Sequence, residues 1–100
     1  MEIKHNDIVR CVRKGEGYEY DNVCIMNSEG YRFYDLRHNA MHGQQFDGEA
    51  HRTPMEMLKI WNKNWKFFLV GKYSESKVER FAPIPIVVEG RKIVKRVIRD

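Results

Sequence analysis

Cysteine and long apolar runs are scarce in this chain, and each scarcity excludes a class of protein. Only 2 cysteines, Cys11 and Cys24, occur among its 100 residues. Each lies inside an apolar run typical of a strand, which favours reduced, buried thiols in the cytoplasm over a disulfide. No stretch approaches the roughly 20 apolar residues of a membrane span, and the N-terminus has no apolar signal-peptide core. We therefore expect a cytoplasmic protein without a membrane partner.

The sequence also has few of the patterns that catalysis requires. Gly15 and Gly17 lack the third glycine and the following helix of a phosphate-binding loop. Cys11 and Cys24 each occupy the middle of an expected strand, where a thiol is usually buried and unreactive. We therefore predict that the protein is not an enzyme and holds no cofactor.

Three of the four histidines fall within residues 37–52, which form the longest polar stretch. His38 and His42 would align if this stretch were helical, and His51 or Asp47 would complete a zinc site. Neighbouring asparagine and glycine residues disfavour a helix there, and no cysteine accompanies the histidines. We therefore predict an irregular loop with solvated histidines and no bound metal.

Charge is divided unevenly between the two halves of the chain. Residues 1–50 carry 6 Lys+Arg and 9 Asp+Glu, whereas residues 51–100 carry 12 and 5, a net charge of −3 against +7. A basic half suits a nucleic acid or an acidic protein surface as partner, although scattered lysines also keep a small domain in solution. The length suits one domain over residues 1–100, and the 42% apolar and 12% aromatic content indicates that it folds.

The clearest local signals lie between Thr53 and Gly71. Thr53, with Pro54 after it and Glu56 three residues on, forms a capping box and predicts a short helix over residues 53–62. The helix is almost wholly apolar, so we expect it to be buried on most sides. The aromatic and branched run Trp65–Val70 predicts a central or nearly central strand.

Other segments alternate between strand-like runs and turn signals. The turn 27–30 joins two runs into a hairpin, which we expect to share an antiparallel sheet with Trp65–Val70, while the helix covers the core. Prolines predict an edge strand or an extended segment near the end of the chain. The predicted strands are 8–12, 21–26 and 31–36, the loop is 13–20, the polar connector is 72–80, and the edge prolines are Pro83 and Pro85.

The C-terminal stretch 89–100 is strongly basic, and its composition favours a strand while its spacing also permits a helix. A row of basic side chains pairs with phosphates, or it forms the solvated outer face of a terminal element. The basic residues of this stretch are Arg91, Lys92, Lys95, Arg96 and Arg99.

Exposed aromatic residues are a second feature of nucleic-acid-binding proteins, because bases stack on them. We take Tyr18, Tyr20 and Tyr34 as candidates for stacking. In the predicted hairpin, Tyr31 and Phe33 share one face of the sheet, and Tyr34 lies on the other. Packing in the core is the alternative for all these rings.

The opening pattern Ile3-x-x-x-Asp7-x-Val9, followed by a loop and a hairpin, resembles the start of SH3-like small β-barrels. A short helix before a late strand is also usual in such barrels. The basic, aromatic character further resembles accessory proteins of bacterial viruses, which often bind a host protein. The expected fold class is α+β: a small antiparallel sheet, or an SH3-like partly open β-barrel, with one capped helix.

Two functions follow from these observations. The first is a small basic module that binds nucleic acid through the C-terminal basic residues and the exposed tyrosines. The second is a protein-binding inhibitor or adaptor, of the kind that viruses of bacteria encode, acting on a larger nucleic-acid enzyme.

Overall fold

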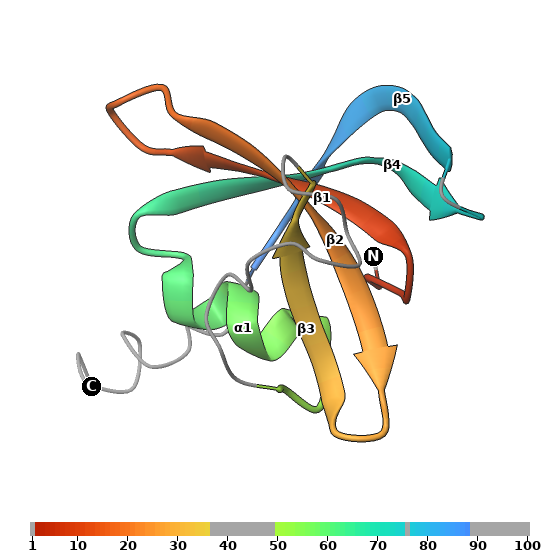
Figure 1. Ribbon diagram of the computed structural model, residues 1–100. Helices are drawn as coiled ribbons and strands as arrows, with labels where there is room; N and C mark the ends of the chain where they lie inside the picture. Colours follow the sequence, from red (N-terminus) through yellow and green to blue (C-terminus); the bar gives the residue numbers. More distant parts are fainter. Residues whose placement is uncertain (1, 37–49, 76, 89–100) are drawn as a thin grey trace, which may run out of the picture.

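A computed structural model describes residues 2–36, 50–75 and 77–88. These residues form a 5-stranded antiparallel sheet with one helix against it, in the strand order β3-β2-β1-β4-β5 (Figure 1). The α+β prediction, with a small antiparallel sheet and one short helix, is confirmed. The elements are β1 (Asp7–Arg13), β2 (Glu19–Asn27), β3 (Gly30–Asp35), α1 (Pro54–Trp61), β4 (Trp65–Ser74) and β5 (Lys77–Ile86).

The β2–β3 hairpin forms where the alternating sequence predicts it. Asn27 pairs with Gly30 across the turn, and the Asn27 side-chain oxygen accepts a hydrogen bond of 2.9 Å from the Glu29 amide. Gly30 has a φ of 130°, and a Cβ there would lie 2.7 Å from the His51 carbonyl oxygen. Glycine is therefore required at this turn, because His51 pairs with the adjacent Tyr31 through two main-chain bonds.

Helix α1 begins as the capping box predicts. The Thr53 amide donates a hydrogen bond of 3.1 Å to the Glu56 carboxylate, and this bond holds the pKa of Glu56 below its usual value. Met57 and Leu58 are buried, whereas Ile60 is 60% exposed. The expectation of burial on most sides is therefore wrong, because only one face of this 8-residue helix packs on the sheet.

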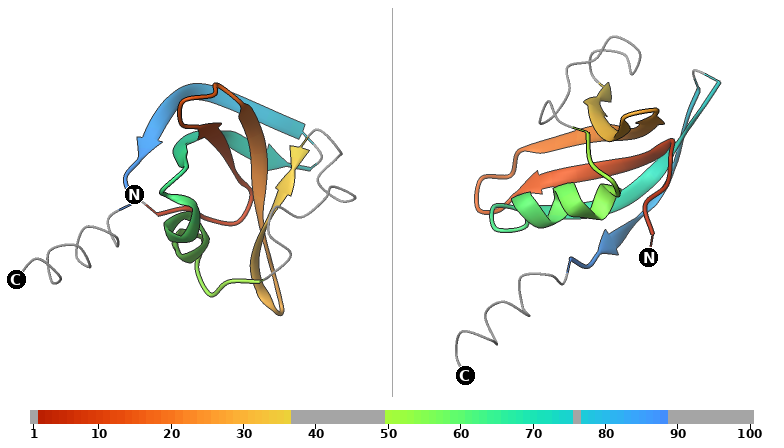
Figure 2. Two further views of the ribbon diagram at one scale, coloured as in Figure 1. Left: turned by 90° about the vertical axis from the view of Figure 1, so that its left-hand side faces the viewer. Right: turned by 90° about the horizontal axis from the view of Figure 1, so that it is seen from below.

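The core lies between α1 and the sheet, which wraps around the helix (Figure 2). Cys11 and Cys24 are free and buried within it, as the apolar runs around them predict. Both tryptophans pack against its margin while remaining partly exposed. Its buried members are Ile3, Val9, Cys11, Cys24, Phe33, Met57, Leu58, Phe67, Ile86 and Val88.

The prediction of a polar connector over residues 72–80 is wrong. β4 continues to Ser74, and β5 begins at Lys77 and pairs back along it. Distant groups hold this extension: the Tyr73 amide donates to the Asn6 carbonyl at 2.8 Å, and the Lys72 ammonium lies 3.4 Å from the buried Asp7 carboxylate. Most of its described side chains are polar and exposed, so the local hydrophobic pattern does not reveal a strand.

Strand β5 lies at the edge of the sheet, as its two prolines predict. β4 is the next strand inward, so the prediction of a nearly central strand from Trp65 is confirmed. The register shifts between Leu69 and Gly71, where β5 bulges. A Cβ on Gly71 would collide with the Glu79 carbonyl oxygen, so the bulge needs glycine at this position.

Candidate functional site

A groove of about 260 Å³ opens at the end of the sheet where β4 begins and β5 ends. β4 starts at Trp65, but its pairing with β5 begins only at Phe67, so among the described residues the first two of β4 have no partner strand on that side. The groove lies at this step, between the start of β4 and the end of β5. We call it the Trp65 groove; it is lined by Lys14, Asn62, Trp65, Lys66, Phe67, Phe68, Pro85 and Ile86.

Aromatic side chains gather around Trp65. The Tyr20 ring lies 5.8 Å from the Trp65 ring, centroid to centroid, with 54° between their planes. Arg13 of β1 pairs with Trp65 of β4 in the sheet, and its guanidinium lies 5.4 Å from the centroid of the Trp65 ring. These contacts orient the indole, and a cation over an aromatic face contributes about 0.5–1 kcal/mol at exposed sites. Trp65 nevertheless stays partly exposed and lines the groove.

Two lysines line the same groove. The Lys14 ammonium donates to the Asn62 carbonyl at 2.8 Å, and the Lys14 amide donates to the Asn64 carbonyl at 2.9 Å. Lys66 is exposed on β4. Within the described part of the chain, neither ammonium group has a carboxylate partner. The groove therefore offers positive charge beside an apolar, aromatic surface.

The end of the described chain is fixed at this groove. The Asn62 side-chain amide donates to the Val88 carbonyl at 3.3 Å, and Val88 is buried in the core. In the sequence, Val88 is followed by the basic stretch of Arg91, Lys92, Lys95, Arg96 and Arg99. These five predicted site residues lie outside the described residues.

The structure separates the three tyrosines predicted for stacking. Tyr20 lies beside Trp65, and Tyr18 is 58% exposed in the segment between β1 and β2. Tyr34 pairs with Val23 on the face of the sheet opposite to Phe33 and is partly buried, so it does not join the Trp65 groove.

Lys14, Trp65 and Lys66 are not among the site residues that the sequence predicts. Trp65 opens an apolar run, and that run predicts only a strand. Lys66, directly after Trp65, was the available signal, since side chains alternate along a strand and a lysine indicates that one face of β4 is exposed at this end. The contact of Lys14 with Asn62 joins residues 48 positions apart and leaves no local trace.

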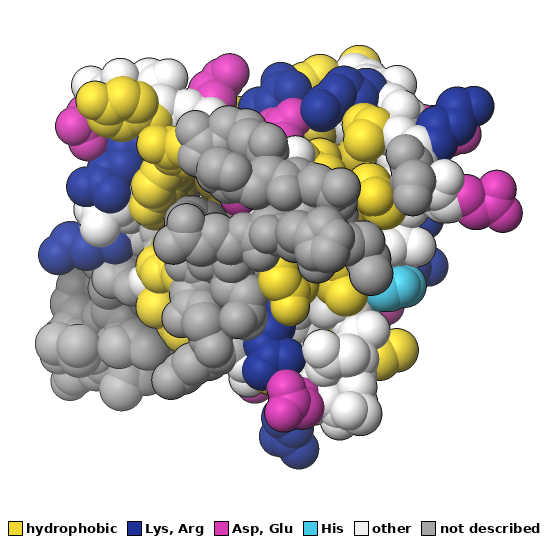
Figure 3. Space-filling model, viewed as in Figure 1, with side chains coloured by type: hydrophobic (Ala, Val, Ile, Leu, Met, Phe, Trp, Pro, Cys, Tyr) yellow, Lys and Arg dark blue, Asp and Glu magenta, His cyan; other side chains and the backbone are white. Residues whose placement is uncertain are grey.

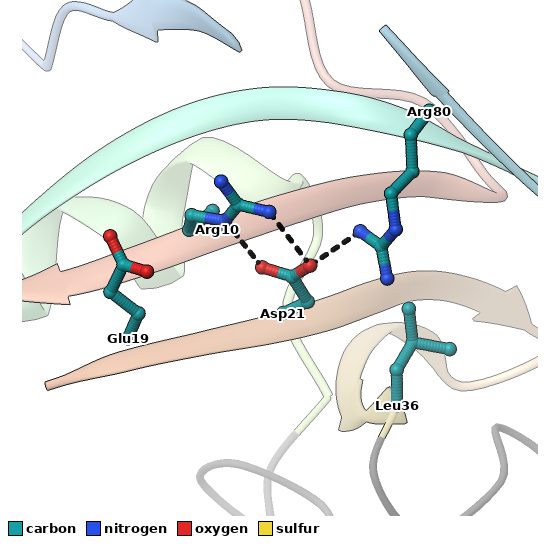
Figure 4. A pocket seen from close by; sticks show the side chains of 5 residues that line it. All are labelled: Arg10, Glu19, Asp21, Leu36 and Arg80. Atoms are coloured by element: carbon teal, nitrogen blue, oxygen red, sulfur yellow. Dashed lines mark hydrogen bonds and ion pairs between the residues drawn. The ribbon is translucent and has the colours of Figure 1, made fainter.

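A second cleft, of about 330 Å³, contains a network of opposite charges (Figure 4). The Arg10 guanidinium donates to both oxygens of Asp21, at 2.8 and 3.3 Å, and Arg80 of β5 donates to the same carboxylate. Burial alone would raise the pKa of Asp21, but the bonds from Arg10 and Arg80 outweigh it and lower the pKa. Glu19 and Leu36 complete the lining. Because the Asp21 carboxylate already engages both arginines, this cleft has less charge to offer a ligand than the Trp65 groove.

Apolar side chains are also exposed along edge strand β5. Val78, Phe81 and Ile84 are 40%, 46% and 41% exposed. In the space-filling view, hydrophobic side chains lie among Lys and Arg side chains at the upper right, where β5 runs (Figure 3). Exposed edge strands with apolar side chains are typical of surfaces that contact another protein.

Two further predictions concern a metal site and a membrane span. His38, His42 and Asp47 lie outside the described residues, and within residues 2–36, 50–75 and 77–88 no three His, Cys, Asp or Glu side chains cluster to hold a metal. The one described helix is too short to cross a membrane. Comparison with protein-family models, with curated proteins and with solved structures gives no match to this chain.

Proposed function

We propose that this protein is a small non-enzymatic module that binds nucleic acid at the Trp65 groove. The observation that carries the proposal is that Lys14 and Lys66, without carboxylate partners in the described chain, line the same groove as the partly exposed Trp65. Lysines attract phosphates and make binding sensitive to salt, while aromatic faces stack on bases without regard to sequence.

The basic residues after Val88 extend this proposal. In it, Arg91, Lys92, Lys95, Arg96 and Arg99 add phosphate contacts near the groove, and Tyr18 and Tyr20 add aromatic surface. The attachment of Val88 to Asn62 supports this arrangement, because Val88 precedes these residues in the sequence and is held beside the groove.

The fold supports a finer structural proposal, that the sheet is an SH3-like, partly open barrel. Its strands wrap around α1 (Figure 2). β5 also bonds through Arg80 to Asp21 on β2. In this proposal, the Trp65 groove is the opening at one end of the barrel.

Binding of a labelled oligonucleotide, measured by fluorescence anisotropy across a range of salt concentrations, tests the function. The double substitution Lys14→Gln and Lys66→Gln should weaken binding at low salt and flatten the slope of log K against log salt by about 1–2 units. Lys77→Gln is the matched control, because Lys77 lies at the opposite end of the β4–β5 hairpin. No binding by the wild type at low salt would reject the proposal.

A protein partner is the second candidate, favoured by the exposed apolar residues of β5. Pro83 and Pro85 have no N–H to donate, which restricts strand addition to the first half of β5, where Val78 and Phe81 are exposed. The protein would then be an inhibitor or adaptor, such as a virus of bacteria encodes, for a larger nucleic-acid enzyme. In a pull-down, the partner should remain bound after nuclease treatment. The variant Phe81→Ser should no longer retain it.

A further inference from the structure

We infer that the Trp65 groove takes one unpaired base of a single-stranded nucleic acid, with Lys14 and Lys66 on the adjacent phosphates. This inference rests on the proposed function and adds the strandedness of the ligand and the manner of its contact. It follows from the shape of the groove, its apolar lining and the placement of its two charges.

The groove suits a flat, partly apolar group of the size of one base. Its volume of about 260 Å³ lies just below the range of roughly 300–1,000 Å³ usual for pockets that take drug-sized molecules. Phe67 is buried, while Trp65 and Phe68 are partly exposed and line the same space. A ligand that enters therefore meets aromatic and aliphatic surface as well as charge.

Duplex nucleic acid does not present the matching surface. In a helix the faces of the bases are stacked on one another, so a protein meets phosphates, sugars and base edges. Unpaired bases expose their faces and stack on aromatic side chains. An aromatic groove with lysines is therefore better matched to a single strand than to a duplex.

The two lysines approach the groove from different elements. Lys14 lies just after β1 and is held by the carbonyl of Asn62 at the end of α1, whereas Lys66 belongs to β4. Trp65, the residue directly before Lys66, lies on the other face of β4, where it contacts Tyr20 on the helix side of the sheet. Ammonium groups from two separate elements thus line the same groove as the aromatic rings, as contact with a stacked base and its adjacent phosphates requires.

Tryptophan fluorescence tests the contact directly, because the chain has 2 tryptophans and only Trp65 lines the groove. In the variant Trp61→Phe, a mixed-sequence single-stranded oligonucleotide should quench the remaining Trp65 emission on binding. In the matched variant Trp65→Phe, the same oligonucleotide should leave the Trp61 emission nearly unchanged. Trp65→Leu should weaken binding by roughly tenfold or more, the loss expected for one stacked base.

The same titrations with a duplex of identical sequence separate this inference from the proposed function. Single-strand binding that is at least several-fold tighter than duplex binding, with quenching of Trp65, supports the inference. Duplex binding without single-strand binding, or single-strand binding without quenching of Trp65, overturns it and leaves nucleic-acid binding intact. Absence of binding to either form at low salt overturns both. If Trp65→Leu does not fold, the fluorescence of the Trp61→Phe variant still decides.

Discussion

Arg80 on edge strand β5 donates a hydrogen bond to Asp21 on β2, although β1 and β4 lie between these strands in the sheet order. In a flat sheet, strands separated by two others would be about 14 Å apart. The bond therefore requires strong curvature, and Arg10, which pairs directly with Asp21, completes the network. Figure 4 shows both guanidinium groups directed at the one carboxylate.

Asp21→Asn should lower the free energy of unfolding by about 1–3 kcal/mol, because hydrogen bonds to charged groups are worth this much and two arginines lose their partner. Urea denaturation measures the change. Glu19→Gln is the control, since Glu19 lines the same cleft but is exposed, and it should change stability by no more than about 0.5 kcal/mol. Equal stability of Asp21→Asn and wild type would contradict a stabilising role for the network.

The contribution of Asp21 should depend on pH in a defined direction. Its pKa is lower in the folded state than in the unfolded chain, so its stabilisation is present above the unfolded value of about 4 and is lost as pH falls through the folded value. The difference in unfolding free energy between wild type and Asp21→Asn should be constant near neutral pH and shrink below about pH 4. A difference that grew on acidification would show that the pKa of Asp21 is raised instead.

Gly71→Ala should destabilise the protein by more than about 2 kcal/mol, because the new Cβ would meet the backbone of Glu79 in the bulge between β4 and β5. Gly15→Ala is a useful comparison, since Gly15 has a φ of 81° and open space around it. Its cost should be about 1–2 kcal/mol, from backbone conformation alone. Thermal or urea unfolding of both variants ranks them, and a smaller cost at Gly71 would rule out the tight bulge.

Cys11 and Cys24 should react slowly with a thiol reagent in the native protein. Burial raises the pKa of each thiol to about 12, so at neutral pH very little of the reactive thiolate is present. We expect native rates more than about a hundredfold below those in denaturant, where the pKa returns to about 8.5. Absorbance assays with an aromatic disulfide, with and without guanidinium, measure both rates. Rapid labelling of both residues without denaturant would refute their burial.

Replacing Lys95 and Arg96 together by Gln should flatten the salt dependence of nucleic-acid binding by about 1–2 units in the slope of log K against log salt. In this proposal the two charges act on the ligand, so the melting temperature of the free protein should hardly change. If these residues do not contact the ligand, the variant will bind as the wild type does at every salt concentration. Val97→Asp separates a packing role from a charge role, since it leaves the basic residues in place.

The sequence alone determined those elements whose signals lie within a few residues of one another. The β2–β3 hairpin follows from alternation and the turn at Asn27–Gly30, and the start of α1 follows from Thr53, Pro54 and Glu56. Pro83 and Pro85 identified an edge strand because proline lacks an N–H. The apolar neighbours of the cysteines indicated burial. Each of these is a local rule of backbone geometry or hydrophobic pattern.

Only the tertiary structure decided the rest, because it depends on which strands pair and in what register. The extension of β4 and β5 through a polar segment rests on partners such as Asn6 and Asp7, far away in the chain. The same is true of the Arg80–Asp21 bond, which joins residues 59 positions apart. The Trp65 groove exists because β5 stops pairing at Phe67, so that Lys14, from a distant loop, comes to line the same space as Trp65 and Lys66. Neither residue composition nor local periodicity encodes where one strand ends relative to its neighbour.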